Sequence, residues 1–458
     1  MRPVGYCLLL VGLSGAAVAA WRDTGGSLAQ LAAALALYGL GVLGALGVLL
    51  ASRQPKTGRQ AAGTLGTILL AAGLLGALAL RYGSSAATHV QTVLVLLDYA
   101  AGVAGAVILL QAWQEAEAQQ SFWKRFLSSA PGRALLALVL VMYLGVLFPA
   151  PGSAVGLAET WQKAAFFKLG THRDGLRQAS VFGILACGMT LVIITGGIDL
   201  SVGSVLALVA VCFSLAVIHW SWPPWLAILV CLGIGAACGA ASGSLTALLR
   251  IQPFIATLAM MVFARGLAKW ACGGMKVSTA IKNPDGSYRY VDVPSIFRAI
   301  DSRILGDNIA MVSVIFLICA LASWLLLARH RWGRELYAIG GNEEAARLSG
   351  VNVTFSKILA YSASGVLAAV AGICQAAQEQ QGDSEAGNGY ELTAIAMVVI
   401  GGTSLMGGRG GMGLTLIGVL TIGYLEKILS INAVPEAGRL MLTGLIIVVA
   451  VLTQRRRR

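Results

Sequence analysis

Apolar runs of about the length needed to cross a membrane recur along the whole chain, and no other feature constrains its fold as much. A transmembrane helix needs roughly 20 consecutive apolar residues. Only 12% of the 458 residues are charged, whereas soluble domains contain about 25%. Too few polar residues remain to cover a surface exposed to water. The chain is therefore expected to be an all-α, polytopic transmembrane helical bundle in a lipid bilayer.

The basic residues lie in short loops between the apolar runs, where Lys and Arg mark the cytoplasmic side of a membrane. The formal net charge of +13 is therefore read as a topology signal, and nucleic-acid binding is not expected. With the basic clusters at 124–133, 329–334 and 455–458 placed inside, ten spans follow Arg133. They are expected at 134–148, 177–195, 202–219, 224–248, 254–270, 309–328, 356–376, 391–405, 412–428 and 437–453.

The N-terminal part is expected to be a separate membrane unit. Residues 1–115 contain four further apolar runs, 116–133 form a cytoplasmic linker, and 134–458 form the core. The total is then about 14 spans, with the C-terminus in the cytoplasm. Residues 1–20 also fit a signal peptide, and both interpretations stay open. Asp98 lies within the fourth span and either packs inside the bundle or has a function there.

Two of the predicted spans are interrupted by the same pattern, Gly-Gly-x-x-Leu-x-x-Gly. Paired glycines break a helix and leave backbone groups that a solute path tolerates but lipid does not. Matching breaks in two parts of a transporter indicate such a path. The residues expected to line it are Gly196, Gly197, Asp199, Ser201, Gly401, Gly402 and Thr403. Asp199 is equally well explained as a cap of the helix that follows it.

A very short helix is expected in the cytoplasmic loop before the span at 356–376. Asn342 is a good N-cap, Glu343 and Glu344 suit the positive helix start, Arg347 suits the negative end, and Gly350 supplies a left-handed stop. A helix of about seven residues is unstable alone in water. It therefore needs a surface to dock on, which is either the protein's own body or a soluble partner.

Several classes of chemistry find no support in the sequence. The Gly-x-Gly-x-x-Gly at 408–413 follows no strand, so it does not indicate a dinucleotide site, and no phosphate-binding P-loop motif occurs. The eight Cys form no CxxC pair and have no His at ligand spacing, so they are expected to be structural thiols. No catalytic residue, metal site or cofactor is therefore expected in this chain.

Four stretches, beginning at Gly188, Gln252, Gly340 and Gly389, resemble the ribose/xylose/galactose-type permeases of the ABC importer superfamily, over about 124–458. The resemblance implies a non-enzymatic subunit that moves a monosaccharide across the bacterial cytoplasmic (inner) membrane by alternating access. It implies three partners: a cytoplasmic ABC ATPase that carries ATP and Mg²⁺, an extracytoplasmic sugar-binding protein, and a second permease copy in a homodimer. The short helix then becomes the ATPase-coupling helix, with Asn342, Glu343, Glu344, Ala345, Arg347 and Gly350.

The sequence also departs from this family. Thr393 stands where members usually carry Asp, Glu426 and Lys427 stand where many carry paired Asn, and the predicted outer loop at 378–388 is unusually acidic. The acidic loop raises the question of how a binding protein docks. Two alternatives stay open: an ABC permease for a non-sugar solute such as a nucleoside or signalling molecule, and an ion-coupled secondary transporter that uses Asp98 and Glu426.

Overall fold

The computed structural model describes residues 129–147, 166, 168–282, 287–304, 306, 308–439, 441–442 and 444–445. The expectations for the four N-terminal spans, the signal-like segment, most of the linker and Asp98 lie outside these residues. By its contacts the chain divides into a unit of Phe126–Ala433 and a second unit of Met1–Arg125 with Val434–Arg458. The elements below belong to the first unit.

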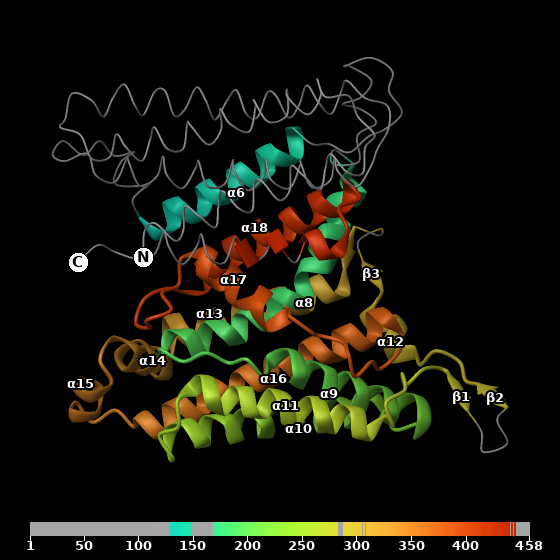
Figure 1. Cartoon of the computed structure of the whole chain (residues 1–458), viewed down its shortest axis with the longest axis horizontal. Coiled ribbons are helices and arrows are strands. Elements are labelled where there is room, and N and C mark those ends of the chain that lie inside the picture. Colours follow the sequence, from blue (N-terminus) through green and yellow to red (C-terminus); the bar gives the residue numbers. More distant parts are fainter. Residues whose placement is uncertain are drawn as a thin grey trace, which may run out of the picture. The chain divides into compact units, whose positions relative to one another are not determined.

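The described part of this unit is a bundle of apolar helices (Figure 1), as the sequence predicts. The helices are α6 (Ala130–Leu147), α8 (Leu169–Ile194), α9 (Val202–Ser214) with the π-helix η2 (Leu215–His219), α10 (Pro224–Ala247), α11 (Pro253–Ala271), α13 (Met311–Arg329), α16 (Val353–Glu379), α17 (Tyr390–Gly401) and α18 (Met412–Ile431). Seven of the described helices, with α9 and η2 taken as one, are long and apolar enough to cross a membrane. The apolar stretch Ala130–Gly145 of α6 and the helix α17 are shorter.

Smaller elements connect the long helices at the two ends of the bundle. Between α11 and α13 lie the strand pair β1 (Ala280–Lys282) and β2 (Tyr288–Tyr290), the helix α12 (Ser295–Ile300), and the pair β3 (Arg303–Ile304) and β4 (Ile309–Ala310), both pairs antiparallel. Between α13 and α16 lie α14 (Arg331–Gly341) and α15 (Glu343–Leu348). Figure 1 shows α15 and β1–β2 at opposite ends of the bundle. Following the predicted topology, we call these the inner and the outer end.

Helix α16 is the centre of the unit, since it packs against α8, α9 and α10. Glycine makes these contacts close. A Cβ on Gly365 would collide with the backbone of Gly235 in α10, and one on Gly372 would lie 3.1 Å from Val209 Cβ in α9. Small residues at such crossings let helix backbones approach, which is how membrane helices gain packing energy without a hydrophobic driving force.

Helix α16 also provides a scale of depth. At the inner end Lys357 Nζ lies 2.7 Å from Glu343 Oε2 of α15, and at the outer end the helix finishes at Glu379. At 1.5 Å per residue these two positions are about 33 Å apart, close to the roughly 30 Å of a bilayer core. Positions along α16 can therefore be read as depths in the membrane.

One predicted span differs from the structure. The span expected at 391–405 is α17, which has 12 residues and is only about 18 Å long. The reason lies in the segment before it. A Cβ on Gly382 would lie 2.9 Å from Ser214 Cβ, whereas a Cβ on Gly387 would lie 2.5 Å from Gly203 O. Between these contacts the chain descends about 16 Å along α9, so 380–389 is a segment that enters the bundle from its outer end.

Candidate solute path and coupling helix

The first glycine break, between α8 and α9, is organised around a buried carboxylate. Asp199 is 1% exposed, and its Oδ1 accepts hydrogen bonds from Ser201 N at 3.0 Å and Ser201 Oγ at 2.6 Å. Its Oδ2 accepts from Ser364 Oγ of α16 at 2.8 Å. Asp199 therefore holds the turn before α9 and ties this turn to the central helix, but it is not the N-cap of α9, since that position is Ser201 and no side chain caps the helix.

This break lies at membrane depth. Ser364 is seven residues beyond Lys357 in α16, which places Asp199 about 10 Å from the inner surface. The adjoining carbonyl of Ile198 accepts a hydrogen bond from Thr257 Oγ1 of α11 at 3.2 Å. Non-helical backbone at such depth is tolerated where protein satisfies its polar groups or where it lines a cavity. Here neighbouring helices supply the partners.

The second glycine break follows α17 and contacts the first. Gly402 ends α17 with a left-handed φ of +109°, and Thr403 is fully buried. Gly408 N then donates a hydrogen bond of 2.9 Å to Ile194 O, the last carbonyl of α8. A Cβ on Gly407 would lie 2.8 Å from Gly196 N. The structure thus brings together the two breaks that the sequence singled out.

A third segment, the end of α14, meets both breaks. A Cβ on Gly340 would collide with Ile194 O and lie 2.5 Å from Gly408 N. Tyr337 Oη, one turn earlier, donates a 3.0 Å hydrogen bond to Gly410 O. Sequence reasoning assigned no role to Gly340 or Tyr337. Only Asn342 separates α14 from α15, so α15 is joined directly to the segment that contacts both breaks.

The short helix forms as predicted. Asn342 Oδ1 accepts from Ala345 N at 3.0 Å, and the chain leaves the helix through Gly350 with φ +82°. Ala346, 5% exposed, packs in a small core with Ile339 and Val353. Part of the surface that this helix needs is therefore supplied by its own chain, one of the two possibilities left open by the sequence.

The opposite face of α15 is uncovered. Glu343 is held by Lys357, and Arg347 reaches Glu343 at 3.4 Å and Glu344 at 3.7 Å. Leu348, however, is 81% exposed. Among the described large apolar side chains only Met406, in the second break, is more exposed. Sequence reasoning missed Leu348, although an apolar residue at the end of an otherwise polar helix is a signal that could have identified it.

Glu335 fixes α14 to α16. Its carboxylate accepts from Arg331 Nε at 2.8 Å and from Ser356 Oγ at 2.9 Å. The hydrogen bond from Arg331 is the largest influence on its pKa, and together with the Ser356 hydroxyl it holds the pKa of Glu335 below its usual value. The inner end is thus a connected frame, in which α14 contacts both breaks and α16.

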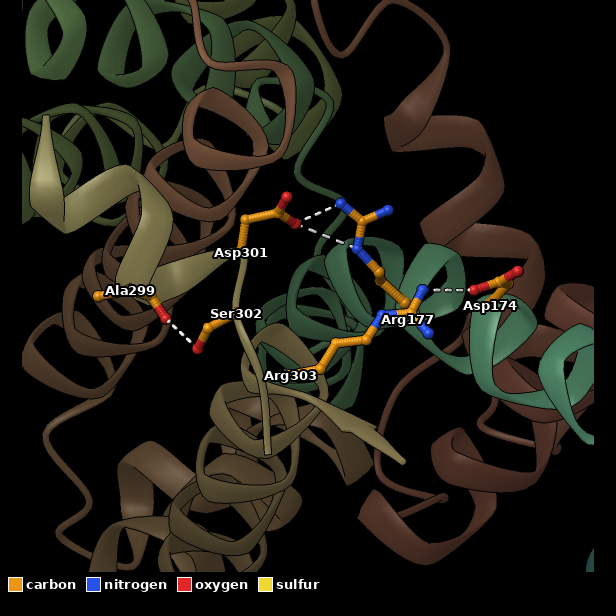
Figure 2. Close-up of polar contacts among 6 residues, drawn as sticks. All are labelled: Asp174, Arg177, Ala299, Asp301, Ser302 and Arg303. Carbon is orange, nitrogen blue, oxygen red and sulfur yellow. Dashed lines mark hydrogen bonds and ion pairs between the residues drawn. The ribbon is translucent and has the colours of Figure 1, made fainter. Parts of the chain in front are cut away.

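At the outer end two ion pairs join the start of α8 to the segment after α12 (Figure 2). Arg177 pairs with Asp301, and Arg303 Nη2 lies 2.7 Å from Asp174 Oδ1. The start of α8 contributes the base to one pair and the acid to the other. The two pairs therefore fix both the position and the orientation of the segment after α12 relative to α8. Phe297 of α12 is fully buried, and this short helix therefore covers the outer end of the bundle.

Two of the three acidic residues in the segment at 378–388 pair with lysines of the same chain. Lys276 Nζ lies 2.9 Å from Asp383 Oδ2, and Lys269 Nζ lies 2.6 Å from Glu385 Oε1. A backbone bridge between Val277 and Gly382 adds to this connection. The acidity that distinguishes this segment is therefore partly accounted for by internal partners.

The chain was compared with known proteins. Residues 173–451 match the family described as "Branched-chain amino acid transport system / permease component". The chain belongs to this permease family. The ribose import permease protein RbsC of Escherichia coli K12 is 41% identical over 299 residues, covering 64% of this chain and 88% of that protein. The fructose import permease protein FrcC of Rhizobium meliloti is 34% identical over 295 residues, covering 62% and 78%.

A third relative extends this similarity. The fructose import permease protein FruF of Bifidobacterium longum is 34% identical over 334 residues, covering 72% of this chain and 90% of that protein. No solved structure matches the chain. The resemblance to sugar-type ABC permeases is thus confirmed, and since its described part alone contains seven helices able to span a membrane, the chain is a multi-pass membrane permease.

Proposed function

We propose that this chain is the membrane subunit of an ABC importer for a monosaccharide and that a separate ATPase drives it. The observation that carries the mechanism is the meeting of Gly340 with both glycine breaks next to α15. The names of the relatives, which import ribose and fructose, support a monosaccharide. In this proposal the chain supplies the solute path and the helix that couples it to the ATPase, whereas ATP and Mg²⁺ bind to the ATPase.

In this proposal α15 is the coupling helix, and its exposed face, with Glu344, Ala345 and Leu348, docks on the ATPase. Movement of α15 reaches the breaks along two routes. One runs through the end of α14 to Ile194 and Gly408, and the other through α16 to Asp199. Closure of two ATPases would then change the angles of α8, α9 and α17 at their glycine breaks and alternate the access of the path.

The remaining parts of the assembly follow the same proposal. The chain has about 14 spans, lies in the bacterial inner membrane and keeps its C-terminus in the cytoplasm, consistent with the basic residues at 455–458. Two copies form the path, and an extracytoplasmic sugar-binding protein delivers the solute to the outer end. Residues 1–115 are an additional membrane unit.

The coupling assignment is tested by removing the exposed face of α15. We expect Leu348→Ala, and the double variant Glu344→Ala with Arg347→Ala, to lower co-purification of the ATPase and ATP-driven uptake in parallel. The matched control is Leu249→Ala, because Leu249 is also exposed (66%) but lies just after α10. If the ATPase stayed bound and uptake were unchanged in the α15 variants, the coupling assignment would be wrong.

A second solute class is favoured by the family's own description, which names branched-chain amino acids. Competition assays on the reconstituted importer separate the two classes. We expect unlabelled ribose or fructose to compete with the transported sugar and leucine not to compete. Uptake that required a proton or sodium gradient in place of ATP would instead support an ion-coupled secondary transporter.

A further inference from the structure

Two charged side chains, one on α17 and one on α11, lie at membrane depth within electrostatic range of each other. Glu391 is in the first turn of α17, and Arg265 is in α11. Each is only partly buried. Three polar residues assigned to the path from sequence differ in this respect, since Asp199, Ser201 and Thr403 are at most 2% exposed.

The depth of Glu391 follows from its contact with α9. A Cβ on Gly203 would lie 2.5 Å from Glu391 Oε2. Gly203 is 16 residues before the end of η2 at His219, a rise of about 24 Å from the outer end. Asp199 already lies about 10 Å from the inner surface, and α9 continues outward from there. Glu391 is therefore well inside the bilayer core.

Arg265 is at a similar level and holds the entering segment in place. Its Nη1 donates to Ser384 O at 2.5 Å and Ala386 O at 2.7 Å. Along α11, Arg265 is eight residues beyond Thr257, which contacts the first break, and hence about 12 Å further out. These two carbonyls lie in the non-helical segment before α17, so the Arg265 guanidinium supplies the hydrogen bonds that a helix would otherwise provide.

Exposure of this edge of the bundle to lipid would be energetically unfavourable. Charged side chains within the bilayer face a bundle interior or water, and non-helical backbone at this depth needs protein or a water-filled cavity beside it. Here Asn388 and Leu392 are exposed next to Glu391. This edge is therefore expected to face protein or water, and not lipid.

We propose that the solute path runs along this edge, between the start of α17 and the middle of α11, with Glu391 and Arg265 as its polar contacts for a polyhydroxylated solute. A carboxylate accepts and a guanidinium donates paired hydrogen bonds, which matches neighbouring hydroxyl groups on a sugar. The other wall comes from the second copy of the chain, so the path is incomplete in one copy. Asp199 and the glycine breaks then act as the frame that moves this edge. This inference rests on the proposed import function.

Thiol labelling tests whether the edge faces water. In proteoliposomes that contain the whole transporter, Leu392→Cys is treated with a charged, membrane-impermeant thiosulfonate supplied on both sides. The control is Leu321→Cys in α13, which is 55% exposed against 52% for Leu392. The parent chain has eight Cys of its own, so its labelling is subtracted from that of each variant. We expect rapid labelling at residue 392, slowed by saturating ribose or fructose, and none at residue 321; equal rates would overturn the proposal.

Transport kinetics test the role of Glu391. We expect Glu391→Gln to raise the KM for uptake about tenfold, because a charged hydrogen-bond acceptor is lost, with a smaller change in maximal rate. Glu379→Gln, at the outer end of α16, is the control. An unchanged KM in a Glu391→Gln transporter that still imports would contradict the contact. If the Glu391→Gln variant fails to assemble, the proposed path is tested by the labelling of Leu392→Cys alone. Absence of ATP-driven uptake in the unaltered transporter would instead contradict the import function itself.

Discussion

At the scale of single residues, Asp199 shows how one buried carboxylate joins two elements. It accepts from Ser201 next to α9 and from Ser364 in α16, and both serines are at most 2% exposed. Leaving a buried charged acceptor short of a donor costs about 1–3 kcal/mol. The sequence placed Asp199 next to the start of α9, where Ser201 is the N-cap, but the bond to Ser364 joins residues 165 positions apart and has no local signal.

We expect Ser364→Ala to lower the free energy of unfolding by about 1–2 kcal/mol, because Asp199 Oδ2 loses its donor. Ser214→Ala is the matched control, since the Ser214 hydroxyl is buried in α9 without a hydrogen-bond partner. Thermal unfolding of the detergent-solubilised protein measures both. Equal effects of the two substitutions would mean that the contact with Asp199 contributes nothing.

Glu335 gives a prediction for pH. The Arg331 guanidinium holds the pKa of Glu335 below its usual value, so its tie between α14 and α16 stabilises the fold fully above the carboxyl's unfolded pKa of about 4.3. The contribution is lost as the pH falls through the lower folded pKa. We expect Glu335→Gln to destabilise at neutral pH and to lose this acid-dependent part of unfolding. Glu344→Gln, on the exposed face of α15, is expected to follow the unaltered protein, and a Glu335→Gln curve parallel to it at every pH would refute the prediction.

At the scale of elements, the contact of α14 with both breaks depends on one missing side chain. We expect Gly340→Ala to push α14 away from Ile194 and Gly408 and to reduce uptake more than it reduces ATPase binding. Gly341→Ala, one residue later, is the control, because a Cβ there meets nothing within 4 Å. Reconstituted uptake and ATP hydrolysis measured together show the difference. Identical behaviour of the two variants would show that the close approach is not needed for coupling.

Most elements follow from the apolar pattern, because a spanning helix is a local property of about 20 residues. The span predicted at 202–219 coincides with α9 and η2, and Asn342 and Gly350 bound the short helix as expected. The span at 391–405 was predicted too long, since the apolar pattern cannot show that the chain begins α17 deep in the bundle. The meeting of the two breaks also escaped prediction, because it depends on backbone packing between distant glycines.

At the scale of the whole molecule, the order of elements fixes which parts lie on opposite sides of the membrane. One spanning helix, α13, separates the β1–β2 region from α14 and α15. Because the loop that contains Arg329, Arg331 and Arg334 is basic, we expect α15 to lie in the cytoplasm. The outer ion pairs of Asp174 and Arg177 must accordingly face the other side, where a binding protein would arrive.

This arrangement is tested in intact cells or spheroplasts. An epitope inserted between β1 and β2 is expected to bind antibody without permeabilisation, whereas one inserted after Gly350 is expected to require it. A fluorescent protein fused after Arg458 is expected to fold and fluoresce, since an even number of spans returns the C-terminus to the cytoplasm. Labelling of both epitopes from outside would contradict the assignment of α13 as a span. If both epitopes are placed as expected but the C-terminal fusion does not fluoresce, the number of spans after α18 differs from the proposal, and so does the proposed total of about 14.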